Sequence, residues 1–293
     1  MRSNFKPARM QYTLRCRMLL ALLAFTLAGA GSASAQTEVY RFSPVNQWDI
    51  TKTASYWNPI IQYVSQKSGV PMQLKIGRTS ADTTAYVIAQ EVEFIFSNHL
   101  FNPQRLKLGW KVFGRRKGEK LHGQIAVAAN SGITTLEQLR DMEVGFAGNE
   151  AFVGYKVPMA QLLGRGIPVR PVFSGNQNAA FVQLFSGRVR AVGSNSMLIE
   201  GYAERENKAF RMLWSSEGYQ DLALMASSKV PDNVLRDISA AFFGMHSDPR
   251  GRAILEAASN VVSLSAEDYF IPASMRDYAN YVRFFENAPV SLH

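Results

Sequence analysis

The sequence holds one cysteine in 293 residues, Cys16, so a disulfide framework and a thiolate metal cluster are both excluded. Histidine occurs only four times and without H-x-x-x-H spacing, which gives no support for a zinc site. Long apolar runs are also missing, because no stretch reaches the roughly 20 apolar residues that cross a bilayer. With 47% hydrophobic residues, the chain can still form one large core or two smaller ones.

Patterns for catalysis are missing as well. The nucleophile elbow G-x-S-x-G, the phosphate loop and the dinucleotide G-x-G-x-x-G are absent after residue 35, and no alternating Asp/Asn calcium loop occurs. We therefore expect no metal, no cofactor and no enzymatic activity.

Positive charge without acidic residues is confined to the N-terminus. Residues 1–35 carry five basic and no acidic side chains, so they supply five units of the net charge of +9 and leave +4. An apolar run from Met18 to Ala28 follows, and Ala33-Ser34-Ala35 is typical of a cleavage site. This layout predicts a signal peptide over residues 1–35 and a periplasmic protein. The remaining charge of +4 gives no reason to expect binding to nucleic acid or to a membrane.

Short β-branched or aromatic runs alternate with longer helical segments in the remaining chain. The expected strands cover residues 39–43, 72–76, 94–96, 125–129, 143–147, 169–173, 189–193, 211–215 and 222–226. The expected helices cover residues 50–68, about 82–90, a short stretch from 135, 150–163 and a segment ending at 186–187. This alternation predicts an α/β fold with largely parallel sheets.

One basic run stands out in the middle of the chain. Arg115, Arg116 and Lys117 lie between Gly114 and Gly118, which favours a solvated loop. A docking patch for a partner is the alternative.

Five segments, in this order and spacing, carry a family resemblance. They are residues 57–71, 130–141, 184–191, 213–217 and 248–255. Together they resemble the phosphate/phosphite/phosphonate-binding family of periplasmic substrate-binding proteins of ABC transporters, over about residues 39–272. The resemblance implies a type II-like periplasmic-binding fold, in which two three-layer αβα lobes are joined by two crossing strands and close over a ligand. One lobe would hold residues 36–127 and 224–293, and the other residues 128–223.

The binding motifs of the family are altered in this chain. Where the family has Ser-Thr-Ser-Gly-Tyr, residues 151–155 of this chain are Ala-Phe-Val-Gly-Tyr. Gln177 replaces the histidine of the family's Gly-Ser-His-Asp-Ala turn, and Ser194-Asn195-Ser196 replaces its Val-Ser-Asp turn. A phosphonate dianion needs several charge-assisted donors to offset its desolvation. We therefore expect a neutral, zwitterionic or weakly charged small molecule instead of a typical phosphonate.

Small polar residues follow most of the predicted strands, where ligands bind in open α/β sheets. For any single one of them an ordinary helix cap is the better explanation, but five or six together favour one ligand cleft. The expected ligand-binding residues are Asn46, Gln47, Ser80, Ser97, Asn98 and His99 from the first lobe, and Glu150, Phe152, Tyr155, Gln177, Asn178 and Asn195 from the second. His99 could titrate near physiological pH, or it could cap a loop.

These observations predict a monomeric periplasmic solute-binding protein that delivers a small molecule or oxyanion to an ABC permease. An alternative with the same fold is a sensor or accessory protein for a membrane signalling or redox system. A periplasmic enzyme built on this scaffold is disfavoured, because the catalytic patterns are missing.

Overall fold

The structure, a computed structural model, describes Met1, residues 38–265 and residues 269–293. Apart from Met1, the expected signal peptide lies outside the described residues. The chain divides into the units Met1–Glu38 and Val39–His293, and every helix and strand described below belongs to the second unit. Among the described residues, no helix is both long enough and apolar enough to cross a membrane.

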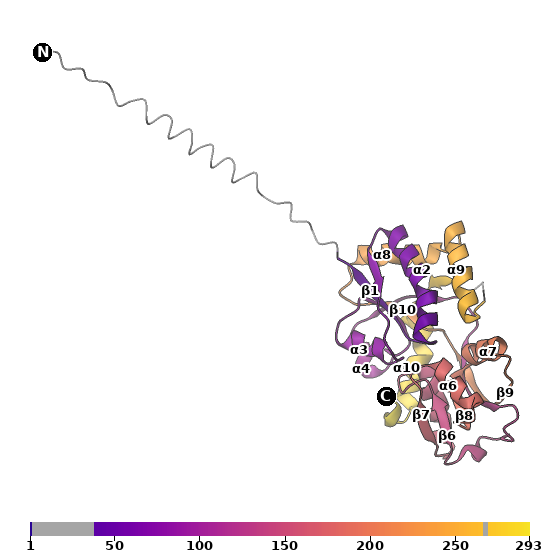
Figure 1. Cartoon of the computed structure of the whole chain (residues 1–293). Coiled ribbons are helices and arrows are strands. Elements are labelled where there is room, and N and C mark those ends of the chain that lie inside the picture. Colours follow the sequence, from indigo (N-terminus) through magenta and orange to yellow (C-terminus); the bar gives the residue numbers. More distant parts are fainter. Residues whose placement is uncertain (2–37, 266–268) are drawn as a thin grey trace. The chain divides into compact units, whose positions relative to one another are not determined.

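The second unit alternates strands and helices along the chain (Figure 1). The strands are β1 (Tyr40–Pro44), β2 (Met72–Leu74), β3 (Phe94–Ser97), β4 (Lys111–Arg116), β5 (Leu121–Ala128), β6 (Glu143–Phe146), β7 (Arg170–Phe173), β8 (Ala191–Asn195), β9 (Phe210–Tyr219), β10 (Ala223–Ala226) and β11 (Phe270–Pro272). The α-helices are α2 (Ile50–Ser68), α3 (Asp82–Ile88), α4 (Pro103–Leu106), α5 (Val157–Gly164), α6 (Gln177–Phe185), α7 (Ser196–Arg205), α8 (Asp232–Gly244), α9 (Pro249–Val262) and α10 (Ala279–Asn287). The shorter helical turns are η1 (Glu137–Leu139), η2 (Phe152–Lys156), η3 (Met275–Tyr278) and η4 (Val290–Leu292).

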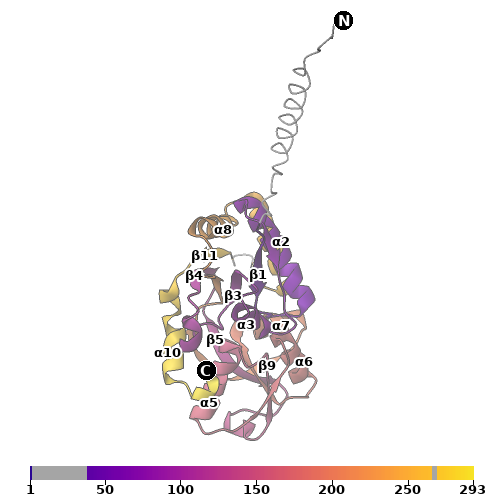
Figure 2. The ribbon, with the colours of Figure 1, turned by 90° about the vertical axis from the view of Figure 1, so that its left-hand side faces the viewer.

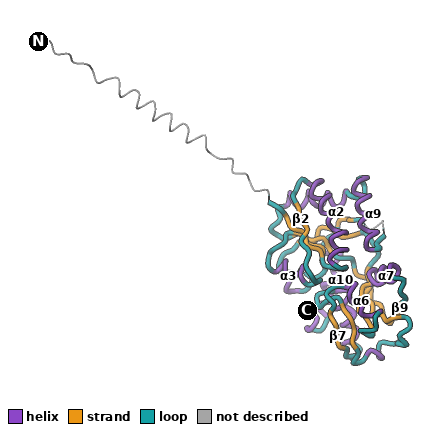
Figure 3. The backbone as a smooth tube through the Cα atoms, in the orientation of Figure 1, coloured by secondary structure: helices purple, strands orange, loops and turns teal. Residues whose placement is uncertain are grey.

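The strands form two sheets, which Figure 3 shows as two separate groups of strands. The first sheet has the order β11-β4-β10-β3-β1-β2, and the second has the order β7-β6-β8-β5-β9. We call the part of the chain built on each sheet the first and the second lobe. The expectation of largely parallel sheets was wrong, because β4, β5, β9, β10 and β11 all pair antiparallel with their neighbours. The parallel pairs join β1 to β2 and β3, and β6 to β7 and β8.

The first sheet is buried on both faces. Successive side chains of a strand point to opposite faces, and β3 shows this directly. Phe94 and Phe96 pack in one cluster with residues of α2, α8 and α9, whereas Ile95 packs in another with residues of α3 and α10. Such an all-apolar strand is typical of a sheet covered by helices on both sides. The first lobe therefore has three layers.

The second sheet is covered in the same way. On β5, Ala126 belongs to the cluster that holds residues of α6 and α7, while Ile125 and Val127 belong to the cluster that holds residues of η1 and α5. These packed layers confirm the expected two-lobed α/β architecture.

Two short segments connect the sheets along the chain. Residues 117–120 lead from β4 to β5, and residues 220–222 lead from β9 to β10. The boundaries expected from the sequence, at 127/128 and 223/224, stay a prediction. Because β5 pairs with β8 and β9 from Leu121 onward, we favour moving the first boundary to just before that residue.

The expectation of a solvated loop at the basic run was wrong for two of its three residues. Arg115 and Arg116 belong to β4, and the side chain of Arg116 is only 2% exposed. Its Nε lies 2.6 Å from Oδ2 of Asp221, which belongs to the connecting segment 220–222. A buried ion pair therefore ties the end of β4 to this segment.

Candidate ligand-binding site

A small cavity of about 40 Å³ lies between the two lobes. Its walls come from the loops that follow β1, β2, β3 and β6, from η2, from the end of β8, from the first turns of α6 and α7, and from the segment before β10. The lining residues are Val45, Asn46, Gln47, Ser80, Asn98, His99, Ala147, Ala151, Phe152, Val153, Gly154, Gln177, Asn195, Leu198 and Leu222. This room is far below the roughly 300–1,000 Å³ of sites for drug-sized ligands. The lobes are therefore closed on one another in this structure.

The structure brings eight of the twelve expected site residues together around this cavity. They are Asn46, Gln47, Ser80, Asn98, His99, Phe152, Gln177 and Asn195. Most of them stand where a strand ends and a helix or loop begins. Asn195, for example, ends β8, and its Oδ1 accepts a hydrogen bond from the backbone N–H of Leu198 to cap α7.

Four buried side-chain atoms around the cavity find no hydrogen-bond partner among the described residues. They are Oδ1 of Asn46, Nε2 of Gln47, Oγ of Ser80 and Nε2 of His99. The other end of three of these groups is held in place. Asn46 Nδ2 donates to the carbonyl of Gly77, Gln47 Oε1 accepts from Arg116, and His99 Nδ1 pairs with the hydroxyl of Thr84. Buried polar atoms are rarely left unpaired, so these four mark where a ligand could be held.

His99 is a neutral group in this site. Its side chain is buried, and burial lowers the pKa of the imidazole to about 4, although the carboxylate of Glu150 acts in the opposite direction. At neutral pH the ring therefore holds one proton, and Nε2 donates or accepts according to the tautomer. The expected titration of His99 near physiological pH was wrong for this closed structure, because burial disfavours the charged form.

Among the described residues that line the cavity, none carries a carboxylate, an ammonium or a guanidinium group. The two cations that donate hydrogen bonds to lining residues are paired with acids. Arg116 reaches Gln47, but it is bound to Asp221, and Arg105 is bound to Glu150. The site is therefore polar without a net charge in its wall.

The other four expected residues lie outside the lining. Ser97 Oγ accepts from the backbone N–H of His99, and Asn178 Oδ1 accepts from Arg205. The ring of Tyr155 packs edge-on against Phe146, with 4.9 Å between ring centroids. Each of these groups is thus engaged by its own lobe.

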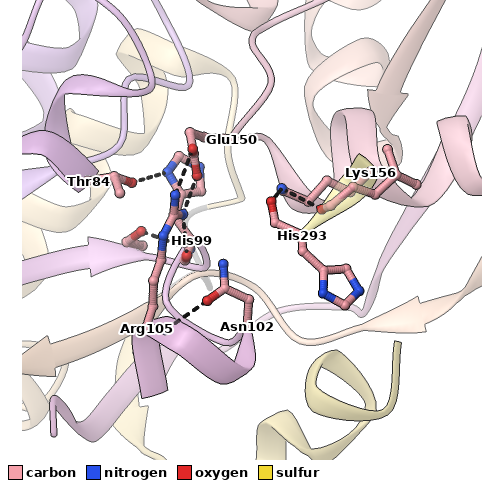
Figure 4. Close-up of polar contacts among 9 residues, drawn as sticks. Thr84, His99, Asn102, Arg105, Glu150, Lys156 and His293 are labelled. Atoms are coloured by element: carbon pink, nitrogen blue, oxygen red, sulfur yellow. Dashed lines mark hydrogen bonds and ion pairs between the residues drawn. The ribbon is translucent and has the colours of Figure 1, made fainter. Parts of the chain in front are cut away.

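Glu150, the fourth of these residues, contacts the opposite lobe (Figure 4). Its Oε1 lies 2.8 Å from Nη2 of Arg105, and its Oε2 accepts from Nη1 of the same guanidinium. Burial raises the pKa of Glu150, but the hydrogen bonds from Arg105 outweigh burial and leave this pKa below its ordinary value. The carboxylate is therefore charged and paired across the junction.

The lobes meet at the backbone as well. The N–H of Ser80 in the first lobe donates to the carbonyl of Gly175 in the second at 2.8 Å. A side chain on Gly148 would have its Cβ 2.8 Å from Ser80 Oγ, so this approach needs glycine. Ser80 therefore closes one side of the cavity.

Sequence patterns missed the apolar part of the wall and the two arginine pairs. Val45, Leu198 and Leu222 line the cavity, but nothing local distinguishes them from core residues. Arg105 and Glu150 are 45 residues apart, and Arg116 and Asp221 are 105 apart. No spacing rule links residues so distant in the chain.

A larger open hollow of about 330 Å³ lies beside residues 117–120. Its lining carries both signs of charge, including Lys117, Lys120, Glu200 and Glu204. None of the described residues around it has a buried polar atom without a partner. We therefore place the candidate site in the smaller cavity.

Comparisons with known proteins agree with this architecture. PhnD1 of Prochlorococcus marinus, solved in complex with methylphosphonate, is 14% identical, with a TM-score of 0.72 over 85% of this chain and 98% of that one. A binding protein component of an ABC phosphonate transporter from Pseudomonas aeruginosa is also 14% identical, with a TM-score of 0.71 over 85% of this chain and 86% of that one. The aliphatic sulphonate binding protein SsuA of Escherichia coli gives a TM-score of 0.56 at 14% identity, over 85% of this chain and 92% of that one. These likenesses show the fold.

No curated protein matches the chain at the level of sequence. A family model described as "ABC transporter, phosphonate, periplasmic substrate-binding protein" matches residues 42–278. This match includes the whole lining of the cavity and both sheets, except for the first two residues of β1. The chain therefore belongs to the phosphonate-binding family of periplasmic substrate-binding proteins of ABC transporters.

Proposed function

We propose that the chain is an exported receptor that binds one small molecule in the cavity between its lobes and presents it to an ABC permease. Family membership supports the general role. The observation that carries the site is the set of four buried, unpartnered polar atoms from Asn46, Gln47, Ser80 and His99. All four come from the first lobe, so the ligand would be held there and then covered by the second lobe. Exchange of the ligand requires the lobes to separate, and no chemical conversion is part of the proposal.

The ligand in this proposal is a small neutral, zwitterionic or weakly charged molecule. Methylphosphonate is bound by the protein of Prochlorococcus marinus, but a doubly charged ligand would meet no charged side chain in this lining. Taking an unpaired ionised group out of water is very costly, and charge-assisted hydrogen bonds are the usual compensation. Here Arg105 and Arg116 already have carboxylate partners.

The hydrogen-bonding character of the wall also restricts the ligand. Asn46 offers an acceptor, Gln47 offers a donor, and Ser80 and His99 can serve as either. A ligand that both donates and accepts hydrogen bonds satisfies all four groups. Leaving any one of them unpaired would cost about 1–3 kcal/mol. Small amides, alcohols and amino acids have this mixed character.

Calorimetry and thermal unfolding with a panel of such ligands test the proposal. Binding to the native state alone raises its stability by RT ln(1 + [L]/Kd), so an unknown ligand reveals itself by a higher Tm. We expect a neutral or zwitterionic member to stabilise the protein, and methylphosphonate to bind no better than millimolar. A micromolar constant for methylphosphonate would contradict the assignment of ligand charge.

Variants then locate the site. Gln47→Leu removes one unpartnered donor, whereas Asn178→Ala removes an amide that lies outside the cavity on α6. We expect Gln47→Leu to abolish the stabilisation by the ligand and Asn178→Ala to retain it. Equal retention in both variants would place the ligand elsewhere.

A further inference from the structure

One ion pair joins the two lobes next to the cavity. Arg105 comes from α4 of the first lobe, and Glu150 comes from the loop before η2 of the second (Figure 4). The pair is bidentate, and its side chains are 18% and 15% exposed. Arg105 is also fixed on its own lobe, because its Nη1 donates to the carbonyl of His99 at 2.9 Å and its backbone N–H donates to Asn102. The guanidinium is therefore held in one place, and the carboxylate reaches it when the lobes close.

The pair lies directly behind the wall of the cavity. Arg105 bonds to the backbone of His99, a lining residue, and Glu150 immediately precedes Ala151, which also lines the cavity. Lys156 is the other nearby cation, and its Nζ is directed to the carbonyl oxygens of Leu292 and His293 at the C-terminus. Glu150 is thus the group that cancels the charge of Arg105.

We propose that Glu150 determines the charge selectivity of the site, because it occupies Arg105 and thereby denies this cation to anionic ligands. The proposal rests on the proposed function, since it explains why a site in this family would favour a neutral or weakly charged ligand. The carboxylate and an anionic ligand compete for one guanidinium on the first lobe. The carboxylate is tethered to the second lobe, so it reaches Arg105 each time the lobes close.

Removing the charge of Glu150 therefore gives a definite result. Glu150→Gln keeps a hydrogen-bond acceptor of the same size opposite Arg105 but leaves one uncompensated positive charge beside the cavity. At partly buried sites with an effective dielectric constant near 20, a unit charge several ångströms away changes anion binding by about tenfold or more. Arg105→Gln leaves a negative charge instead and has the opposite effect. The double variant has the same net charge as the wild type.

Three ligands of similar shape separate charge from fit: methylphosphonate, methanesulfonate and methanesulfonamide. At mildly alkaline pH they carry two, one and no negative charges. Binding of each is measured by calorimetry at constant ionic strength to the wild type, Glu150→Gln, Arg105→Gln and the double variant. The matched control is Glu137→Gln, which removes a carboxylate from an ion pair with Arg165 that is exposed at the surface of the second lobe.

We expect Glu150→Gln to gain about tenfold in affinity for methanesulfonate relative to methanesulfonamide, and more for methylphosphonate. Arg105→Gln should shift the ratio the other way, while the double variant and Glu137→Gln should keep the wild-type ratio. If Glu150→Gln weakens all three ligands by the same factor, the pair only holds the lobes together and the proposal is overturned. If Glu150→Gln fails to fold, Arg105→Gln still tests the proposal. An unchanged ratio of the affinities for methanesulfonate and methanesulfonamide in Arg105→Gln would also overturn it. Tight binding of methylphosphonate by the wild type would contradict the ligand charge in the proposed function, whereas the ratio between variants would still test Glu150.

Discussion

Asp221→Asn tests the buried ion pair between Arg116 at the end of β4 and Asp221 in the connecting segment 220–222. Asp221 is 8% exposed at its side chain and Arg116 only 2%, so neither charge is solvated. The substitution keeps the size of the side chain and an amide oxygen, which can still accept the hydrogen bond that the N–H of Leu222 now donates to Oδ1. It removes the negative charge and replaces Oδ2, the acceptor of Arg116 Nε, by an amide NH2 group. The experiment therefore measures the loss of the whole contact with Arg116, its charge and its hydrogen bond.

The expected loss follows from the surroundings of Arg116. Burial alone would lower the pKa of this guanidinium, but Asp221 outweighs burial and holds the pKa above its ordinary value. Without Asp221, the acceptors left are Oε1 of Gln47 at 3.1 Å and the hydroxyl of Tyr56 at 3.5 Å. Breaking a buried pair by removing one partner costs about 3–5 kcal/mol. At about 2–4 °C for each kcal/mol in a protein of this size, the Tm should fall by about 10 °C.

Urea and thermal unfolding, followed by circular dichroism, measure this loss. The control is Asp232→Asn, whose carboxylate is 90% exposed and pairs with Lys111 at the surface. Such exposed pairs contribute about 0–1 kcal/mol, so the control should unfold like the wild type. Replacing both partners, Arg116→Met with Asp221→Leu, should recover most of the loss because no unpaired charge remains. A loss below about 1 kcal/mol in Asp221→Asn would refute this account of the buried pair.

Three further predictions concern the cavity and its supports. The pKa of His99 is lowered to about 4 in the native state and is near 6.5 in the unfolded state, so protonation favours unfolding. The contribution of His99 to the free energy of unfolding should be fully present above pH 6.5, and that free energy should fall by about 3 kcal/mol as the pH drops towards 4. Unfolding curves of His99→Gln should lack this part of the pH dependence. Phe152→Ala should cost about 3–5 kcal/mol in urea unfolding, because the ring is 1% exposed and lies 4.3 Å from that of Tyr281; a cost below 1 kcal/mol would mean that the cluster repacks. Gly154→Ala places a Cβ 2.8 Å from Oε1 of Gln177, so it should displace that side chain and remove the stabilisation by the ligand in thermal unfolding, while Gly164→Ala, with open space around it, should not.

The elements that the sequence predicted best are those with local signals at their ends. The helix Ile50–Ser68 agrees with its expected bounds because Asp49 accepts the N–H of Lys52 at its start and Gly69 adopts φ 72° at its end. The basic run shows the opposite case. The sequence predicted a solvated Arg116 because its immediate neighbours are basic residues and glycines. The acid that pairs with the buried guanidinium, Asp221, is 105 residues away in the chain.

The candidate site was predicted from one rule, that ligands of α/β sheets bind where the strands end. This rule predicts where a residue lies, but not in which direction its side chain points. Asn46 and Asn98 follow β1 and β3, Asn195 ends β8, and all three reach the cavity. Glu150 follows β6 in the same way, but its carboxylate turns to Arg105 on the other lobe. Ser97 ends β3 and turns back to cap its own loop. Only the partners decide which of these side chains remains available to a ligand.

The C-terminal segment adds a contact between the lobes that the two connecting segments do not provide. Figure 2 shows α10 running beside both lobes, with the C-terminus near α5. Tyr278 stacks on Phe101 of the first lobe at 4.7 Å, and Tyr281, on the next helix, stacks on Phe152 of the second at 4.3 Å. Lys156 then binds the carbonyl oxygens of the last two residues.

Opening must therefore either pull Phe152 and Lys156 away from this segment or move the segment together with the second lobe. The first route exposes a fully buried aromatic ring and leaves Lys156 without its acceptors, which makes it the costlier one. In the second route the hinge includes the link between β11 and α10, and the contact of Phe101 with Tyr281 is given up instead. In either case the protein's own aromatic and ionic contacts favour closure. A ligand at the proposed site would then add to closure chiefly through the unpartnered atoms of the first lobe, and hydrogen bonding would select its identity more than the work of closing the lobes.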